Sequence, residues 1–344
     1  MYRDQIKRTA TMPAKGTLFN EDVGVASDPI SEERADQFHH TVLKLLFVAK
    51  CVRLDIDLAV SFLCTRVVNP MVGDEEKLIR TLEYLEGTPK LTRIMGSDGR
   101  MFMQHWVDAS YGIHRDMRGH NGGTTSLGRG VVMHNCSKQR LNTKSSTESE
   151  LVGVSDYLPY TIWASYFLKE QGYKVQQNIF YQDNMSTIKM LENGRPTSSK
   201  SRHIHIRYFF AKDVFEREGL ELQYCKTNEM IADYYTKPLQ GKQFYRLRDA
   251  IMGLNCNDML AKECVGNIER KQKNKTYKKT VASTYIKPKN SKKQKLPGTA
   301  HVVENVRDNH IQKKIIRSND KRTPGVSGPV RGQISQYRVS NNFK

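Results

Sequence analysis

Cysteine is scarce in this sequence, and its spacing argues against two classes of protein. The 344 residues include six cysteines, and none of them forms a C-x-x-C pair. Pairs at that spacing are typical of structural zinc sites, and dense cysteine patterns are typical of small secreted domains. We therefore expect reduced, mostly buried thiols in an intracellular protein.

Long hydrophobic runs are also missing. The longest lies at about residues 45–49, whereas a membrane-spanning helix needs roughly 20 apolar residues. The N-terminal stretch, residues 1–16, contains no apolar segment of the kind found in secretory signal peptides. No membrane partner is therefore expected.

Basic residues, in contrast, are abundant and unevenly placed. The net charge is +19, from 55 lysines and arginines against 36 acids. Nineteen of the basic residues but only three of the acids lie in residues 271–344. Because the residues after Glu263 also lack hydrophobic periodicity, we expect residues 255–344 to form a basic, disordered tail. Such a tail either attracts nucleic acid or acts as a nuclear-import signal, or it is translated sequence without a selected role.

The first 92 residues predict a small helical subdomain behind a polar leader. Residues 1–34 are rich in proline, glycine and aspartate, and we expect a poorly ordered linker there. Apolar residues then recur at spacings of three and four through residues 38–68, the period of amphipathic helices, with a break near residues 53–55. A further helix over residues 74–85 is expected to begin at Asp74, a good N-cap, and to end at Gly87.

From residue 101 the sequence changes to alternating strand and helix patterns. Strands are expected at residues 101–108, 131–134, 179–181 and 220–225, with a glycine-rich connection at residues 119–130. Helices are expected at residues 148–172, 186–192, 205–218 and 229–235. This order predicts a mixed α/β fold in which a mixed sheet is flanked by helices.

Four carboxylates stand where such a fold would bring them together. Asp108 ends the first strand, Asp183 follows a later strand, Glu150 lies in the first turn of the long helix, and Asp233 lies in the last helix. Carboxylates that converge at one sheet edge repel one another unless a divalent cation is bound. An oxygen-only ligand set favours Mg²⁺ or Mn²⁺ over zinc. On spacing alone, however, solvated surface acids remain the simpler interpretation, because the chain has 36 acids.

Five ordered sequence blocks resemble one known family. They are VDASYG at residues 107–112, SKQRLNTKSSTESELVGV at residues 137–154, YQDNMSTI at residues 181–188, SRHIHIRYFFAKD at residues 201–213 and MIADYYTKPLQG at residues 230–241. In this order they are similar to the RNase H domain of Ty1/copia-type retrotransposon Pol polyproteins. The resemblance implies an RNase H-like domain over residues 93–254. It also implies hydrolysis of the RNA strand of RNA–DNA hybrids with two bound Mg²⁺ or Mn²⁺ ions.

The same resemblance assigns the metal ligands. The family's metal-binding acids correspond to Asp108, Asp183, Asp233 and one acid of the TESEL block. Glu150 is preferred there because it directly precedes the hydrophobic run that follows the catalytic glutamate in RNase H sequences. Glu148 is the alternative, and otherwise it would complement the dipole at the start of its helix.

Residues 35–92 resemble the helical end of the reverse transcriptase of the same polyprotein. Leu54 stands where the family pattern usually has proline, so the break between the first two helices is expected to be softer. The chain contains no Asp-Asp pair, and the polymerase palm is therefore missing. We expect no polymerase activity from this chain alone, and we expect the missing palm and fingers to be a partner. The chain thus looks like a C-terminal piece of a polyprotein.

Several polar residues are candidates for contacts with nucleic acid. Lys138, Arg140 and Lys144 precede the long helix, and they either hold hybrid phosphates or are simply solvated. Asn184 would contact a 2′-hydroxyl, cap a helix, or do both. His203 would contact the scissile phosphate, although packing at the start of its helix is the favoured interpretation. No catalytic histidine is assigned.

The sequence therefore predicts the RNase H part of a copia-type polyprotein, which degrades the RNA template during reverse transcription. Its expected location is intracellular, in a cytoplasmic virus-like particle or the nucleus. The alternative is a catalytically inactive retrotransposon remnant that only binds nucleic acid. The presence of all four acids together with their neighbouring motif residues favours the active enzyme.

Overall fold

The computed structural model describes residues 2–20, 24–97, 99–193 and 202–254, apart from the side chains of residues 193–205. All of these residues belong to one compact unit. The predicted basic tail, residues 255–344, lies outside the described residues. No described helix is both long enough and apolar enough to span a bilayer.

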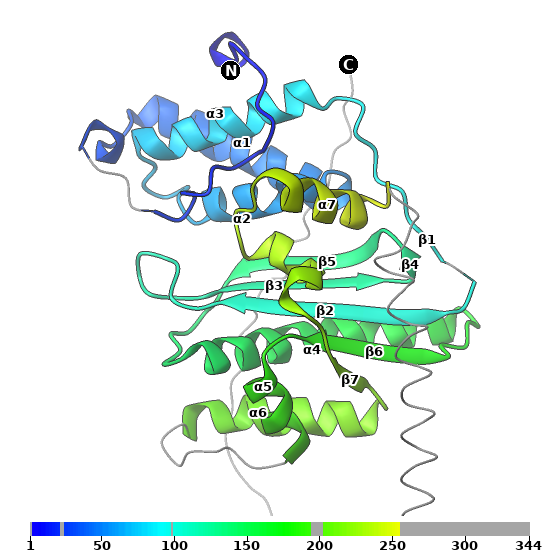
Figure 1. Cartoon of the computed structure of the whole chain (residues 1–344). Helices are drawn as coiled ribbons and strands as arrows, with labels where there is room; N and C mark the ends of the chain where they lie inside the picture. Colours follow the sequence, from blue (N-terminus) through cyan, green and yellow to red (C-terminus); the bar gives the residue numbers. More distant parts are fainter. Residues whose placement is uncertain (1, 21–23, 98, 194–201, 255–344) are drawn as a thin grey trace, which may run out of the picture. The chain divides into compact units, whose positions relative to one another are not determined.

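A five-stranded mixed sheet forms the centre of the described chain (Figure 1). Its strands are β2 (Phe102–Ser110), β3 (His120–Ser126), β5 (Val131–Lys138), β6 (Gln177–Gln182) and β7 (Glu221–Tyr224). They lie in the order β5-β3-β2-β6-β7. The first three strands pair antiparallel, whereas β6 runs parallel to both β2 and β7. The mixed α/β fold predicted from the sequence is therefore confirmed. Two short strands, β1 (Gly96–Ser97) and β4 (Gly128–Arg129), pair separately.

One face of the sheet is covered by helices that follow β5 and β6 in the chain (Figure 1). They are α4 (Ser146–Glu170), α5 (Met185–Asn193) and α6 (Arg202–Arg217). Successive side chains of a strand point to opposite faces, so Val107 and Phe180 pack toward α4 in one apolar cluster with Leu151 and Tyr208. The strand neighbours Trp106 and Tyr181 belong to the cluster on the other face.

The N-terminal helices and the last helix cover that other face (Figure 1). They are α1 (Glu32–Cys51), the 3₁₀ helix η3 (Leu54–Ile56), α2 (Asp57–Cys64), α3 (Val72–Gly87) and α7 (Gly241–Met252). Phe38 and Leu63 of these helices belong to the same buried cluster as Trp106 of the sheet and Ile251 of α7. The helices expected as a separate subdomain therefore form a layer of the same compact unit as the sheet.

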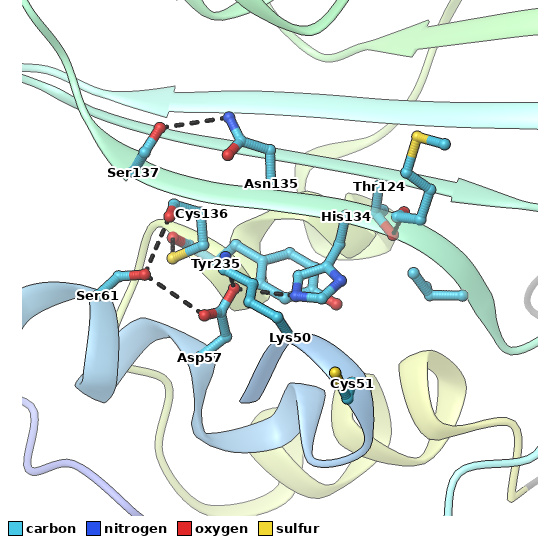
Figure 2. A network of polar contacts seen from close by, with 12 residues as sticks. Lys50, Cys51, Asp57, Ser61, Thr124, His134, Asn135, Cys136, Ser137 and Tyr235 are labelled. Carbon is cyan, nitrogen blue, oxygen red and sulfur yellow. Dashed lines mark hydrogen bonds and ion pairs between the residues drawn. The ribbon is translucent and has the colours of Figure 1, made fainter. Parts of the chain in front are cut away.

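Polar contacts also join this helical layer to β5, as Figure 2 shows. The fully buried Asp57 lies 2.7 Å from Lys50 Nζ and 3.0 Å from Nε2 of His134 on β5. Ser61 Oγ donates a hydrogen bond of 2.9 Å to the carbonyl oxygen of Cys136. Burial would raise the pKa of Asp57, but His134 and Lys50 outweigh it and lower that pKa. The carboxylate is thus charged and paired at the junction of α2 with the sheet.

The expectation of a poorly ordered segment over residues 1–34 is wrong for most of its length. The segment contains two 3₁₀ helices, η1 (Arg3–Gln5) and η2 (Gly24–Ser27), and α1 begins at Glu32. Tyr2 and Leu18 are buried in the core, and Tyr2 Oη donates to Glu75 Oε1 at 3.1 Å. The polar composition concealed these few apolar anchors.

The expected glycine-rich connection over residues 119–130 is also wrong, because it contains β3, a strand buried along its whole length. A Cβ added to Gly122 would lie 2.8 Å from the carbonyl oxygen of Ala232, and one added to Gly123 would lie 2.1 Å from the Tyr157 ring. The two adjacent glycines therefore admit close neighbours on opposite faces of the sheet. Glycine lowers strand propensity, so the pattern concealed the strand.

Smaller differences concern helix boundaries. The third helix begins at Val72, and Asp74 is its third residue, where its carboxylate accepts from the backbone N–H of Met71 at 3.0 Å. The helix predicted at residues 229–235 consists of two 3₁₀ helices, η4 (Thr227–Glu229) and η5 (Ile231–Tyr235). The C-terminal α7 was not predicted. Each of these differences is local and leaves the order of strands unchanged.

Candidate active site

Three aspartates meet at the edge of the sheet where β2 and β6 end. Asp108 lies on β2, Asp183 directly follows β6, and Asp233 lies in η5. Because Trp106 pairs with Tyr181 in parallel register, Asp108 and Asp183 follow at equivalent positions two residues further on. One carboxylate oxygen from each aspartate lies within 4.8 Å of the others. Asp108 and Asp233 are each only 2% exposed.

Glu150 reaches this cluster from α4, on the other face of the sheet. Gly153 allows the helix to approach closely, since a Cβ there would lie 3.1 Å from Ala109 Cβ on β2. The Glu150 carboxylate accepts hydrogen bonds from the Ala109 N–H and from Gln182 Nε2. Burial, followed by the charges of Asp108 and Asp183, raises the pKa of Glu150 well above its ordinary value.

Glu148 has a different position. Its Oε2 accepts from the backbone N–H of Lys144 at 2.7 Å, and its own N–H donates to Ser145 Oγ at 3.2 Å. Ser145 is the N-cap of α4, so this glutamate serves in the capping of its helix. The geometry therefore favours Glu150 over Glu148 as the fourth carboxylate of the site.

Burial and the repulsion between neighbouring carboxylates raise the pKa values of three members of the site. Burial and the nearby Asp108 raise the pKa of Asp233 to about 7. The pKa of Asp108 is also raised, chiefly by burial and further by Asp183, against the opposing effect of Lys237. Buried carboxylates with raised pKa values are typical of sites that bind cations or transfer protons.

Two residues beside the cluster were not singled out in the sequence. Lys237 Nζ lies 2.7 Å from Asp233 Oδ1 and 3.6 Å from Asp108 Oδ1. Burial would lower the pKa of Lys237, but Asp108 and Asp233 raise it overall. Thr236 Oγ1 donates to Asp108 Oδ2. Both residues belong to the MIADYYTKPLQG block, three and four positions after Asp233, and that spacing was the available signal.

The donor set fits a hard divalent cation. All of its side-chain donors are carboxylate oxygens, which Mg²⁺ and Mn²⁺ prefer. Three of the four carboxylates offer oxygens within 4.8 Å of one another. A bound cation would offset the mutual repulsion that adds to burial in raising their pKa values.

The five candidate nucleic-acid contacts differ in their surroundings. Lys138 Nζ pairs with Asp116 Oδ2 at 2.8 Å, whereas Arg140 and Lys144 are exposed. The Asn184 side chain accepts from the N–H groups of residues 186 and 187 at 3.0 and 3.1 Å, so it caps α5. The side chain of His203 lies outside the described residues. The contacts of all five with nucleic acid stay predictions.

The sequence is similar to Pol polyproteins of retrotransposons. It is 25% identical over 221 residues to the Pol polyprotein from transposon TNT 1-94 of Nicotiana tabacum, covering 64% of this chain and 16% of that protein. It is 28% identical over 202 residues to that from transposon RE1 of Arabidopsis thaliana, covering 58% and 14%. The truncated transposon Ty1-A Gag-Pol polyprotein of Saccharomyces cerevisiae is 28% identical over 137 residues, covering 40% and 12%. The chain thus spans only 12 to 16% of the length of these relatives.

Solved RNase H structures are also similar to part of the chain. RNase H1 from Halobacterium salinarum matches 39% of this chain and 90% of its own, with 11% identity and a TM-score of 0.28. The N-terminal RNase H domain of a Mycobacterium tuberculosis protein matches 39% and 89%, with 12% identity and a TM-score of 0.30. No family model matches the chain. The resemblance seen in the motifs is nevertheless confirmed: the chain is similar to part of the Ty1/copia-type Pol polyproteins of plant and yeast retrotransposons.

Proposed function

We propose that this chain is the RNase H portion of a retrotransposon polyprotein and cuts the RNA strand of RNA–DNA hybrids. The observation that carries the proposal is the cluster of Asp108, Asp183 and Asp233, with oxygens within 4.8 Å of one another, and Glu150 beside it. Retrotransposon Pol relatives and RNase H structural neighbours support it.

The four carboxylates would hold two Mg²⁺ or Mn²⁺ ions. Bound there, the ions would supply an activated water and stabilise the leaving 3′ oxygen of the phosphodiester. The chain's own part is to hold the carboxylates together despite their repulsion. Thr236 orients Asp108 by a hydrogen bond, and Thr227 Oγ1 donates to Asp183 Oδ2 at 2.9 Å.

The proposed substrate is recognised by shape and by 2′-hydroxyl groups rather than by base sequence. Arg140 and Lys144 are exposed just before α4 and would contact backbone phosphates. In the life cycle of the element, the reaction would remove the RNA template after first-strand synthesis. The missing polymerase palm and fingers are the proposed protein partner, within a cytoplasmic virus-like particle or the nucleus.

A cleavage assay with the full-length chain and Mg²⁺ tests this proposal. Equal amounts of labelled RNA–DNA hybrid, double-stranded RNA, double-stranded DNA and single-stranded RNA of one sequence are incubated separately. We expect cleavage of the hybrid's RNA strand alone. Asp183→Asn should abolish cleavage, whereas the control Asp213→Asn, which changes an exposed acid on α6, should cut normally.

Two outcomes would contradict the proposal. Cleavage of all four substrates at similar rates would show a nonspecific nuclease. A folded wild-type chain that binds the hybrid without cutting it, at any Mg²⁺ or Mn²⁺ concentration, would instead support the inactive remnant.

A further inference from the structure

Gln182, the last residue of β6, connects the elements that carry three of the four carboxylates. Its side chain is completely buried. It lies on the same face of the sheet as Phe180, toward α4, because strand side chains alternate. This position places a neutral amide between the helix that carries Glu150 and the strand ends that carry Asp108 and Asp183.

The oxygen end of the amide holds the chain where β6 leads into α5. Gln182 Oε1 accepts from the backbone N–H groups of Asp183 and Asn184, at 2.8 and 2.9 Å. Two donors at one end require an oxygen there, so the orientation of the amide follows from its neighbours. These bonds fix the backbone at the residue that carries the Asp183 carboxylate.

The nitrogen end reaches the other two elements. Gln182 Nε2 donates to Glu150 Oε2 at 3.3 Å and to the carbonyl oxygen of Val107 at 3.4 Å. Val107 directly precedes Asp108 on β2. A single side chain therefore contacts the Glu150 carboxylate and the backbone beside both Asp108 and Asp183.

The chemistry of this position calls for an amide. A carboxylate there would add a further negative charge beside Glu150, and lysine or arginine offers no acceptor for the two N–H groups. An apolar side chain would remove the acceptor of those two partly buried N–H groups. Among buried polar side chains of this length, glutamine supplies both the donor and the acceptor without charge.

We propose that Gln182 is a positioning residue that holds Glu150 in register with Asp108 and Asp183 for metal binding. The inference rests on the proposed function and deepens it. Residues that hold metal ligands in place typically change metal affinity by about 10- to 100-fold when replaced. Gln182 acts through the carboxylates and makes no contact of its own with the metal or the substrate.

The test compares Gln182→Met with Gln104→Met in the full-length chain. Both substitutions replace a buried glutamine in the same sheet by an apolar side chain of similar length. Gln104 lies on β2, and its Nε2 donates to Tyr181 Oη at 3.4 Å. Mg²⁺ binding is measured by calorimetry and thermal unfolding without metal, alongside the Mg²⁺ dependence of hybrid cleavage.

We expect Gln182→Met to weaken Mg²⁺ binding about 10- to 100-fold, and to shift the Mg²⁺ needed for half-maximal cleavage by the same factor. Gln104→Met should bind Mg²⁺ like wild type while losing similar thermal stability. Gln182→Asn, which keeps the amide but is one methylene shorter, should fall between Gln182→Met and wild type. This graded loss of affinity separates positioning from a general effect on folding.

Each contrary result has one meaning. Unchanged Mg²⁺ affinity in Gln182→Met, with wild type binding and cutting normally, overturns the positioning role alone. Failure of both Gln182 variants to fold makes the residue structural and also overturns it. A folded wild-type chain that binds no divalent ion removes the proposed function itself, and with it this inference.

Discussion

At the scale of single residues, the site depends on how its negative charge is compensated. Asp108, Glu150 and Asp233 all have raised pKa values, and Lys237 is the cation in contact with two of them. Its side chain is 40% exposed, so the ammonium group can leave the cluster without being buried elsewhere. An incoming divalent cation would therefore compete with Lys237 for the same oxygens.

Replacing Lys237 by methionine should tighten Mg²⁺ binding. A partly exposed ion pair contributes about 1 kcal/mol, which corresponds to roughly a fivefold change in affinity. Calorimetric titration of the variant with Mg²⁺ measures the change. Lys242→Met, an exposed position on α7, is the control and should bind Mg²⁺ like wild type. Weaker binding by Lys237→Met would show that the lysine supports the metal rather than competing with it.

Buried histidines make stability depend on pH. Burial lowers the pKa of His105 to about 4, although the contact of its Nε2 with Asn178 Oδ1 at 2.7 Å opposes that shift. Its Nδ1 lies 2.8 Å from Thr125 Oγ1. The unfolded chain binds the proton near pH 6.5, so the unfolded state is favoured as the pH falls. The stabilising contribution is therefore complete above pH 6.5 and is lost as the pH falls toward 4.

Urea unfolding at pH 7.5, 6.5, 5.5 and 4.5 measures this effect when wild type is compared with His105→Gln. Carboxylates with raised pKa values act in the opposite direction, because they stabilise the folded protein as the pH falls. Both proteins contain these carboxylates, so their contribution cancels in the difference between wild type and variant. Relative to the variant, wild type should lose up to about 1.4 kcal/mol per pH unit below pH 6.5. A stability difference that stays constant with pH would mean that folding does not lower the pKa of His105.

At the scale of elements, the sequence predicted the helices and strands whose apolar residues recur in a clear local pattern. Local patterns predicted the break between α1 and α2, the capped start of α4 and the strand before Asp183. Strand β3 did not, because its glycines are selected by neighbours that are distant in the sequence. Gly122 makes room for η5, and Gly123 makes room for Tyr157. Such contacts leave no periodic signal.

The sequence predicted those parts of the candidate site that depend on local strand patterns, but not the contacts between distant segments. Asp108 lies near the end of β2 and Asp183 directly follows β6, so the parallel pairing of these two strands brings them together. The Asp233 position depended on the family resemblance, since a 3₁₀ helix of five residues has little pattern of its own. The contacts of Gln182, and that of Lys237 with Asp108, became visible only with the fold, because each joins elements far apart in the chain.

Gly122→Ala tests how η5 is placed. Gly122 pairs with Asp108 across β2 and β3, and a Cβ there would lie 2.7 Å from Thr236 Cγ2. Overpacking of this kind costs about 1–3 kcal/mol, and it would displace the segment that carries Asp233. We expect a lower melting temperature together with weaker Mg²⁺ binding. Gly16→Ala is the control, because the nearest side-chain atom to a Cβ there is 3.8 Å away, and it should change neither the melting temperature nor Mg²⁺ binding. If Gly122→Ala also leaves both unchanged, η5 shifts to accommodate the methyl group without cost.

At the scale of the whole molecule, the central sheet and the N-terminal helices belong to one compact unit. Trp106, Ile251 and Phe38 share a buried cluster, and Tyr234 Oη next to Asp233 donates to the carbonyl oxygen of Asp55 at 3.0 Å. The helical layer thus covers one face of the sheet and holds the segment that carries a metal ligand. The boundary drawn at residue 93 from the family resemblance separates chain segments that share one core.

Removing the N-terminal layer should therefore prevent folding. A chain of residues 93–254 would expose the apolar face of the sheet and of α7, whereas residues 1–254 retain their cover. Circular dichroism, proteolysis and size-exclusion chromatography of the two chains measure the difference. We expect residues 93–254 to be aggregated or protease-sensitive. If they are monomeric and melt as cooperatively as residues 1–254, the shared core is not required for folding.

The carboxylate cluster is most directly tested by the melting temperature of the full-length chain as a function of Mg²⁺, for wild type and Asp108→Asn. Ligands that bind only the folded state raise its stability with concentration, so wild type should gain a saturable increase. Asp108→Asn should melt higher than wild type without metal, because repulsion is relieved, and should gain little from Mg²⁺. A Mg²⁺ response that is absent from wild type, or equal in both proteins, would contradict the assignment of this cluster as the metal centre.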